Sequence, residues 1–376
     1  MGFTRCVADP CLYVRRDGDA WAIAGLATDG LIHLESSDAE HADVLGALQA
    51  KYVWVDEGLV SDVPAVLGTK VKQDIAAGTV SLSQEGYIAS LAEEYGAELP
   101  ARKPATPAAQ DLEGRVREAL DSKAEARDPA LVHWYQRIVG ALIWASIVSR
   151  PDICWAVGML SRAMAYPTEA LQADALRCLA YLVATKTLCL NYSRSTYFSA
   201  RSGTPMARGG GDGAAGCISI DEGTSDSDFA AGPSVSGWEW RLAGAAVLYG
   251  SKRQSGTMLS SAAAELVAGS VAATDGVFFR NVLGELGWAQ SRPTTLWIDN
   301  NATVAMSHNP MAFHKTKHVA RRHHYLRECV EERELDVRHI RTEFNVSDIF
   351  TKALEGRKFR LFRAALMNLP LETVEG

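Results

Sequence analysis

The first hundred residues alternate between strand-like and helix-like hydropathy patterns. Two β-hairpins and two helices are predicted there, in the order 11–35, 37–52, 66–84 and 85–96. The hairpins pair the apolar strands on either side of Asp17-Gly18-Asp19 and of Ala76-Ala77-Gly78, which are typical turn sequences. Ser36 or Ser37 supplies the N-cap of the first helix. The beginning of the chain therefore resembles the middle of a domain.

Two stretches with few large apolar residues divide the chain. Residues 99–129 contain four prolines and little apolar periodicity, so we expect a linker there. Residues 199–216 are rich in glycine and form the clearest boundary. Between them, residues 131–187 predict a helical block that breaks at Pro151 and near Pro167.

After the glycine-rich stretch the pattern becomes mixed α/β. Strands are predicted over 235–241, 244–250, 294–299 and 335–342. Helices are predicted from Ser260 to about Leu286, near 301–308 and from about 317 to 332, followed by one or two closing helices. We therefore expect an α/β (α+β) fold in this part of the chain.

Composition and charge narrow the class of protein. The 376 residues are 47% hydrophobic, which is typical of globular domains with proper cores. The net charge of −7 argues against a nucleic-acid binder that is basic over its whole surface, but it leaves room for a local basic face.

Cysteine usage and apolar runs indicate an intracellular protein. The seven cysteines are scattered without CxxC spacing, so neither a disulfide framework nor a thiolate zinc site is predicted. By sequence alone, no apolar run reaches the ~18–20 residues of a membrane span, and no signal peptide is expected. We expect a cytoplasmic or nuclear location and no membrane partner.

Several carboxylates stand at the predicted ends of strands or starts of helices. Asp299 closes the apolar strand TTLWID, Glu265 lies one to two turns into a helix, and Asp348 begins a closing helix. Asp226 and Asp228 lie just before the first strand of the mixed unit. Such carboxylates suit Mg²⁺, which takes oxygen ligands. Each one alone is more often a solvated charge or a cap, and spacing does not show that they converge.

Residues 314–327 form a basic segment with five Lys or Arg, four His and no acid. This composition favours contact with a nucleic-acid backbone, and the alternative is a solvated helix face. A zinc site at His314 and His318 lacks further ligands. His339 on a predicted strand is interpreted as structural.

The motif order in residues 225–355 closely resembles the ribonuclease H domain of copia-type LTR retrotransposons. The matching motifs are SGW, GSKRQ, LSSAAAELVA, LWIDNNATVAMSHNP, HKTKHVARRHHYLRE and VSDIFTKAL. The resemblance implies a ribonuclease-H-like mixed sheet flanked by helices, and a metal-dependent endonuclease that cuts RNA in RNA–DNA hybrids. It implies two Mg²⁺ ions, with Mn²⁺ as a substitute, and no small-molecule cofactor.

The resemblance also implies the residues of the site. The catalytic and metal-binding carboxylates are Asp226, Glu265, Asp299 and Asp348. Asp221 or Asp228 remains an alternative to Asp226, because the loop that follows is shorter than the family's. The implied nucleic-acid-binding residues are Lys252, Arg253, Asn300, Lys315, Lys317, His318, Arg321 and Arg322.

The upstream half resembles the end of the reverse transcriptase of the same polyproteins. GFTRCVADPCLYVRRDGD and YQRIVGALIWASIVSRPDI carry this resemblance. Where the family has Tyr-x-Asp-Asp, this chain has Ala27-Thr28-Asp29-Gly30, so Asp29 and Gly30 form a degenerate site and polymerisation is not expected. The implied domains are a partial palm (1–98), a linker (99–129), a helical thumb or connection (130–198), a glycine-rich linker (199–216) and a ribonuclease-H-like domain (217–376).

Other interpretations differ in function. The chain could bind nucleic acid without cutting it, or be a transposon remnant that lacks its upstream polyprotein domains. An integrase is disfavoured, because that relative uses two aspartates and then a glutamate, whereas Glu265 precedes Asp299 here.

Overall fold

The computed structural model describes residues 1–27, 30–122, 128–193, 196–198, 205–207, 218–229, 233–309 and 320–370. The strands are β1 (Thr4–Arg5), β2 (Leu12–Asp17), β3 (Ala20–Ala27), β4 (Gly30–Glu35), β5 (Lys70–Asp74), β6 (Thr79–Ser83), β7 (Leu190–Ser193), β8 (Thr196–Phe198), β9 (Pro205–Ala207), β10 (Ile220–Ser227), β11 (Val235–Leu242), β12 (Ala245–Arg253), β13 (Thr294–Ile298) and β14 (Leu335–His339). The α-helices are α1 (Asp38–Gln49), α2 (Glu85–Tyr95), α3 (Leu112–Ser122), α4 (Pro129–Val148), α5 (Cys154–Arg162), α6 (Glu169–Ala184), α7 (Ser261–Glu285), α8 (Asn301–His308), α9 (Ala320–Glu331) and α10 (Gly356–Met367). Short 3-10 helices include η1 (Gly96–Glu98), η2 (Pro151–Ile153), η5 (Thr342–Phe344) and η6 (Val346–Phe350).

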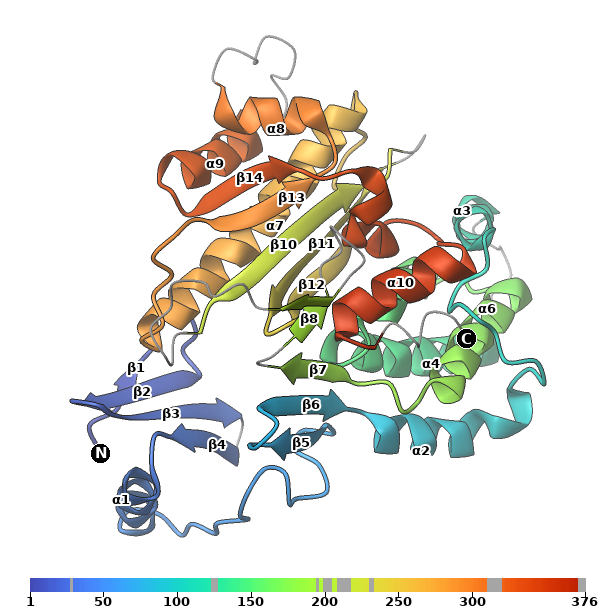
Figure 1. The fold of residues 1–376 in the computed structure, drawn as a ribbon. Helices are drawn as coiled ribbons and strands as arrows, with labels where there is room; N and C mark the ends of the chain where they lie inside the picture. The colour runs from blue at the N-terminus through green and yellow to red at the C-terminus, as the bar shows by residue number, and fades with distance from the viewer. Residues whose placement is uncertain are drawn as a thin grey trace.

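A five-stranded mixed sheet forms the centre of the C-terminal half (Figure 1). Its order is β12-β11-β10-β13-β14, with β10, β13 and β14 parallel and β11 antiparallel to both of its neighbours. Helix α7 covers one face together with α9, and Leu266, Phe279 and Leu326 share the core beneath them. The expected mixed α/β sheet flanked by helices is therefore confirmed.

The central strand β10 was not predicted from the hydropathy pattern. Its sequence IDEGTSDS contains one large apolar residue and no alternation of apolar and polar positions. It nevertheless lies between β11 and β13, with Thr224, Ser225 and Asp226 buried. A strand that is hydrogen-bonded on both sides satisfies its backbone donors and acceptors whatever its side chains are. Its place in the sheet, rather than hydrophobic side chains, therefore accounts for this strand.

Helices α5 and α10 pack against β12 on the other side of the sheet, and α4 and α6 pack against α5. The predicted helical block is confirmed, with breaks at both predicted prolines. Its buried side chains share one core with β12 and η6, in which Leu142 and Phe350 are fully buried. The Tyr249 hydroxyl on β12 also donates to the Ser146 carbonyl of α4 at 2.9 Å. Packing from both sides fixes the sheet that carries the carboxylates.

The N-terminal segment forms two smaller sheets. The first predicted hairpin, over residues 11–35, is present as β2 and β3. The segment after the turn, predicted as one strand, forms two strands, β3 and β4, which pair with each other. Ser37 is the N-cap of α1, and its side chain accepts from the Glu40 amide. The second predicted hairpin is present as β5 and β6, and β7 joins it as a third strand.

Residues 112–122, within the segment expected to be a linker, form helix α3. Leu112, Val116 and Ala119 are buried at helical spacing and pack against α5 and α6. The prolines and the high content of charged residues around this short stripe obscured its period. The expected glycine-rich boundary lies largely outside the described residues, and the proposed domain limits remain predictions.

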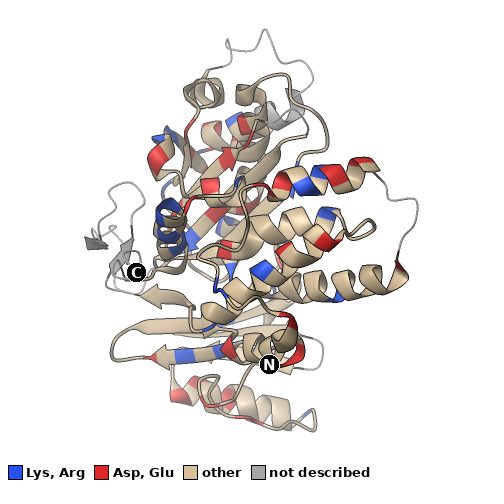
Figure 2. Ribbon diagram, turned by 90° about the vertical axis from the view of Figure 1, so that its right-hand side faces the viewer, with Lys and Arg blue, Asp and Glu red and all other residues tan. Residues whose placement is uncertain are grey.

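Two helices pass the length and composition test for a membrane span, although the sequence analysis expected none. Helices α4 and α7 are long and apolar enough to cross a membrane by length and composition alone. Both contribute buried side chains to cores of this structure, which also explains their apolar composition. Acidic and basic residues are interspersed along the described elements, in keeping with the modest net charge (Figure 2).

Candidate metal centre

Three carboxylates from different elements converge at one end of the five-stranded sheet. Asp226 is on β10, Asp299 directly follows β13, and Glu265 is on α7; an oxygen from each lies within 4.8 Å of the others. The parallel register of Ser225 with Ile298 places the next residue of each strand at the same level. Helix α7 starts after the N-cap Ser260, so Glu265 lies in its first two turns. This start places the Glu265 carboxylate close to those of Asp226 and Asp299.

The fourth predicted carboxylate, Asp348, lies beside this group but is held by lysines. Its side chain is fully buried on η6, and its charge contributes to the raised pKa of Asp226. Lys352 Nζ lies 2.6 Å from Asp348 Oδ1 and 3.9 Å from Asp226 Oδ2, and Lys358 Nζ lies 2.5 Å from Asp348 Oδ2. The structure therefore gathers three of the four predicted ligands into one cluster and pairs the fourth with ammonium groups.

Polar contacts seat η6 against the sheet. Asn345 Nδ2 donates to the Ser225 carbonyl at 2.9 Å, and the hydroxyls of Ser347 and Thr224 are hydrogen-bonded at 2.6 Å. The absence of a side chain at Gly237 permits the close approach, because a Cβ there would lie 2.7 Å from Phe350 Cβ.

Burial and the repulsion between neighbouring carboxylates raise the pKa values of Asp226 and Glu265. Burial raises the pKa of Asp226 to about 7, and the nearby Asp348 charge adds to the shift. Burial raises the pKa of Glu265 well above its usual value, and the charges of Asp226 and Asp299 act in the same direction. The Ser227 amide donates to Glu265 Oε1 at 3.0 Å, which opposes the shift.

These residues fit a divalent cation. Glu265 Oε2 is buried without a hydrogen-bond partner among the described residues, although a buried polar oxygen normally has one. Mg²⁺ accepts carboxylate oxygens and would offset the repulsion that raises the two pKa values. The Thr351 hydroxyl donates to Asp226 Oδ2, which fixes the orientation of that carboxylate.

The two alternatives to Asp226 point elsewhere. Asp221 Oδ2 accepts from the Gly244 amide at 2.8 Å, near the opposite end of β10. Asp228 Oδ1 accepts from the Val235 amide and so bridges the connection to β11. Geometry thus favours Asp226 as the carboxylate of β10 in the cluster.

The predicted nucleic-acid-binding residues are placed unevenly. Asp226 on β10 is paired with Gly237 on β11, which in turn is paired with Ser251 on β12. The exposed residues Lys252 and Arg253 follow Ser251, so they lie at the same end of the sheet as the carboxylate cluster. Asn300 instead caps α8, because its side-chain oxygen accepts from the amides of the second and third residues that follow. The residues Lys315, Lys317 and His318, together with the side chains of Arg321 and Arg322, lie outside the described residues.

The degenerate polymerase site is only partly described. Asp29 lies outside the described residues, and Gly30 begins β4.

Sequence reasoning missed three side chains that shape the centre: Lys352, Lys358 and Gln254. Gln254 Nε2 donates to Ser227 Oγ at 3.1 Å and to the Ala264 carbonyl at 2.9 Å, and so joins β10 to α7 beside the cluster. The motifs GSKRQ and VSDIFTKAL contain Gln254 and Lys352, and were the available signals.

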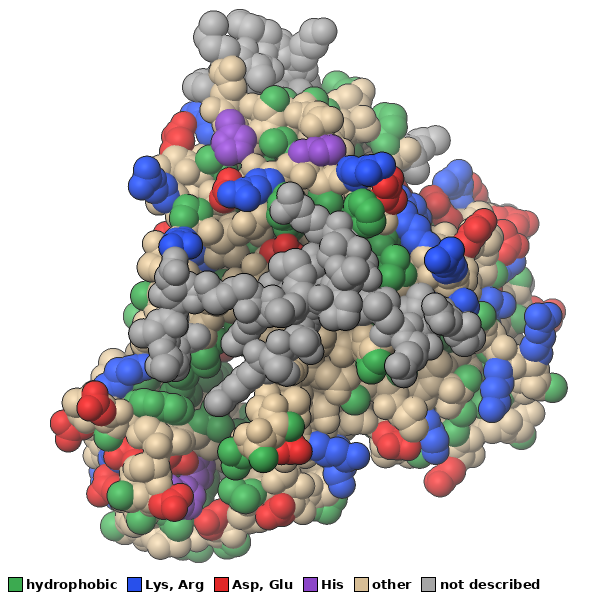
Figure 3. All heavy atoms as spheres, viewed as in Figure 1, with side chains coloured by type: hydrophobic (Ala, Val, Ile, Leu, Met, Phe, Trp, Pro, Cys, Tyr) green, Lys and Arg blue, Asp and Glu red, His purple; other side chains and the backbone are tan. Residues whose placement is uncertain are grey.

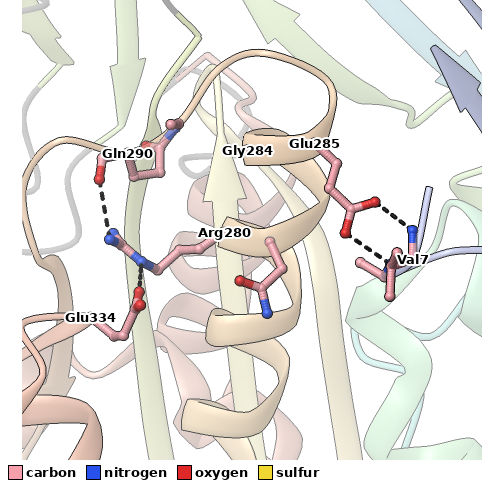
Figure 4. A pocket seen from close by; sticks show the side chains of 9 residues that line it. Val7, Arg280, Gly284, Glu285, Gln290 and Glu334 are labelled. Carbon is pink, nitrogen blue, oxygen red and sulfur yellow. Dashed lines mark hydrogen bonds and ion pairs between the residues drawn. The ribbon is translucent and has the colours of Figure 1, made fainter. Parts of the chain in front are cut away.

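A separate hollow of about 460 Å³ lies near the other end of α7 (Figure 4). Arg280, Glu285 and Glu334 line it, and Glu285 accepts from the Val7 amide at 2.5 Å. Glu265 and Glu285 are twenty residues apart on one helix, about 30 Å at the usual helical rise. This hollow is therefore not part of the carboxylate cluster.

The chain is similar along nearly its whole length to retrotransposon polyproteins. It is 28% identical over 364 residues to the Retrovirus-related Pol polyprotein from transposon TNT 1-94 of Nicotiana tabacum, covering 96% of this chain and 25% of that protein. It is 25% identical over 370 residues to the corresponding polyprotein from transposon RE1 of Arabidopsis thaliana, covering 97% of this chain and 23% of that protein. A putative transposon Ty5-1 protein of Saccharomyces cerevisiae is 30% identical over 212 residues, covering 55% of this chain and 61% of that protein.

These similarities support a copia-type retrotransposon Pol polyprotein fragment, so the predicted resemblance is confirmed. No protein-family model matches the chain. The chain spans about a quarter of the length of the first two relatives.

Proposed function

We propose that this chain is a metal-dependent ribonuclease that cuts the RNA strand of RNA–DNA hybrids. The observation that carries the proposal is the convergence of Asp226, Glu265 and Asp299, whose oxygens lie within 4.8 Å of one another. The motif order of the ribonuclease H domain and the similarity to Pol polyproteins support the same activity.

The residues of the cluster have distinct roles in this proposal. Asp226, Glu265 and Asp299 would hold the metal, and the Thr351 hydroxyl orients Asp226. Two bound Mg²⁺ ions, or Mn²⁺ in their place, supply an activated water and charge stabilisation at the leaving oxygen. Asp348 adds negative charge beside Asp226, and Lys352 and Lys358 limit how much of that charge faces the metal.

Substrate binding would use the cations at the same end of the sheet. Lys252 and Arg253 are exposed there and suit contact with phosphates, which supply affinity without reading sequence. Selection of a hybrid would depend on 2′-hydroxyl groups across a wide minor groove. The predicted contribution of the basic segment, residues 314–327, belongs to the same proposal.

A second candidate is binding of nucleic acid without cleavage. The observation that favours it is the Lys352 ammonium, 2.6 Å from Asp348 and 3.9 Å from Asp226, since a fixed positive charge there competes with a second cation. Polymerisation is not part of either proposal, because the chain has Asp29-Gly30 where two aspartates are needed.

Cleavage of matched duplexes distinguishes the candidates. An end-labelled RNA strand is annealed to DNA or to RNA, and incubated with the full chain in Mg²⁺, in Mn²⁺ or in chelator. We expect metal-dependent cleavage of the hybrid alone, lost in Asp299→Asn and retained in the control Asp336→Asn, which alters an exposed ion pair on β14. Hybrid binding without cleavage in either metal would establish the second candidate instead.

A further inference from the structure

We infer that His33, Glu35 and His41 form a binding site for a divalent transition-metal ion such as Zn²⁺. One ligand atom of each residue lies within 4.8 Å of the others. The site is in the N-terminal sheet, on elements that contribute nothing to the carboxylate cluster of β10 and α7. It does not rest on the proposed nuclease.

Local structure brings the three side chains together. His33 and Glu35 are two residues apart on β4, so both lie on one face of the strand. The chain turns at Ser37, the N-cap of α1, and the His41 amide donates to the Ser37 carbonyl at 3.0 Å. His41 thus lies in the first turn of the helix, directly above the end of β4.

The two imidazoles point at a single carboxylate. His33 Nδ1 contacts Glu35 Oε1, and His41 Nδ1 lies 3.4 Å from Glu35 Oε2. The rings stack with their centroids 5.4 Å apart and an interplanar angle of 16°. Because both Nδ1 atoms and the carboxylate face one another, a cation placed between them would meet one ligand atom from each of the three residues.

The ligand set selects the class of metal. Two imidazoles and one glutamate are a known combination for zinc, with a fourth position open to water. Nitrogen ligands favour Zn²⁺, Co²⁺ or Ni²⁺, whereas Mg²⁺ prefers oxygen. The site is therefore chemically distinct from the all-carboxylate cluster.

A fourth residue supports the orientation of His41. Asp56 Oδ2 lies 3.9 Å from His41 Nε2, on the other side of the ring from Glu35. A ligating histidine commonly directs its second ring N–H at a carboxylate, which fixes the tautomer that binds metal. Asp56 would serve this role when Nδ1 is the ligand.

The site is sheltered but open to solvent on one side. The side chains of His33 and Glu35 are 13% and 10% exposed, and that of His41 is 41% exposed. Figure 3 shows histidine beside acidic side chains on the surface at the α1 end of the molecule. An ion there would fasten the edge strand β4 to α1, so its expected effect is on stability.

Metal titration of the full chain tests the inference. Chelator-stripped protein in excess Mg²⁺ is titrated with Zn²⁺ against a chromophoric chelator, and with Co²⁺ for its visible absorption. We expect His41→Ala and Glu35→Gln each to weaken binding at this site by at least about tenfold, and Asp56→Asn by about tenfold. Wild type should gain thermal stability with Zn²⁺, and Glu35→Gln should not.

Controls separate this site from other binding groups. His133→Ala changes an exposed histidine of α4, and the pair His314→Ala with His318→Ala removes two histidines of the basic segment; all should retain the site. Melting in chelator identifies a variant that fails to fold, and His33→Asn then replaces it. The inference is overturned if wild type binds no Zn²⁺, or if Glu35→Gln and His41→Ala bind as wild type does.

Discussion

Lys352 Nζ lies 2.6 Å from Asp348 Oδ1 and 3.9 Å from Asp226 Oδ2, so one ammonium group faces two buried carboxylates. Burial disfavours the charge on this lysine, but the two carboxylates outweigh that cost and raise its pKa. The lysine therefore partly neutralises the metal-free centre, and it opposes a cation that binds beside it.

Replacement of Lys352 by methionine should affect the metal-free and metal-bound protein in opposite ways. Lys352→Met should destabilise the metal-free protein by about 1 kcal/mol, since the side chain is partly exposed and its ion pairs are screened. Stabilisation by Mg²⁺ should become larger than in wild type, because no ammonium competes with the ion. Thermal melts with and without Mg²⁺ measure both effects. Lys70→Met, at an exposed lysine of β5 in another sheet, is the control, and an equal Mg²⁺ effect in both variants would contradict the prediction.

Two glycines of α7 should respond oppositely to alanine. A Cβ at Gly276 would lie 2.3 Å from Trp240 Cζ2, whereas a Cβ at Gly284 meets nothing within 4 Å. Gly276→Ala should cost about 1–3 kcal/mol, because the buried Trp240 must shift. Gly284→Ala should stabilise by about 0.5–1 kcal/mol through helix propensity. Denaturant unfolding of both variants provides the comparison, and equal effects would show that α7 does not pack on Trp240 as described.

The metal-free protein should lose stability as pH rises toward neutrality. A carboxyl with a raised folded pKa is neutral in the folded state while it ionises in the unfolded state. Asp226, with a pKa of about 7, therefore contributes stability that is complete below about pH 4 and is lost as pH rises through 7. Asp226→Asn should flatten this dependence in chelator. Unfolding free energies of wild type and variant from pH 4 to 8 test it, and parallel curves would count against the raised pKa.

Added Mg²⁺ should oppose the loss of stability that the metal-free protein shows as pH rises. The ion binds deprotonated carboxylates, so its stabilisation of wild type should be larger at pH 8 than at pH 6.

Hybrid binding should depend on the cations at the end of β12. A variant with Lys252→Ala and Arg253→Ala should bind a hybrid more weakly, and the slope of log affinity against log salt should fall by about one for each phosphate that the protein no longer neutralises. Lys70→Ala with Lys72→Ala changes two exposed lysines of β5 in another sheet and serves as the control. Identical slopes for the two double variants would exclude the end of β12 from the interface.

Helices and strands with a regular pattern of apolar and polar residues could be predicted from the sequence. Elements that depend on hydrogen bonds to neighbouring strands could not. The β5–β6 hairpin and helix α7 carry alternation, turn residues or caps that identify them locally. Strand β10 carries none of these, because its neighbours β11 and β13 supply its hydrogen bonds. Helix α3 has only one short apolar stripe between proline-rich and charged stretches.

The candidate site was accessible from sequence mainly through the resemblance. Spacing alone did not show that Asp226, Glu265 and Asp299 converge, since this depends on the parallel register of β10 with β13. The competition of Asp221 and Asp228 with Asp226 could be resolved only by hydrogen-bond partners. Lys352 was not among the predicted site residues, because its distance from the buried carboxylates depends on how η6 packs against the sheet.

The central claim is that the clustered carboxylates bind the metal that cuts RNA, and Glu265→Gln tests it with almost no change of shape. Single-turnover cleavage of a hybrid is measured over a range of Mg²⁺ concentrations for this variant, for wild type and for the exposed control Glu332→Gln. We expect a loss of at least about a hundredfold in Glu265→Gln at every Mg²⁺ concentration, and wild-type rates in the control. Cleavage by a folded Glu265→Gln at the wild-type rate would contradict the account.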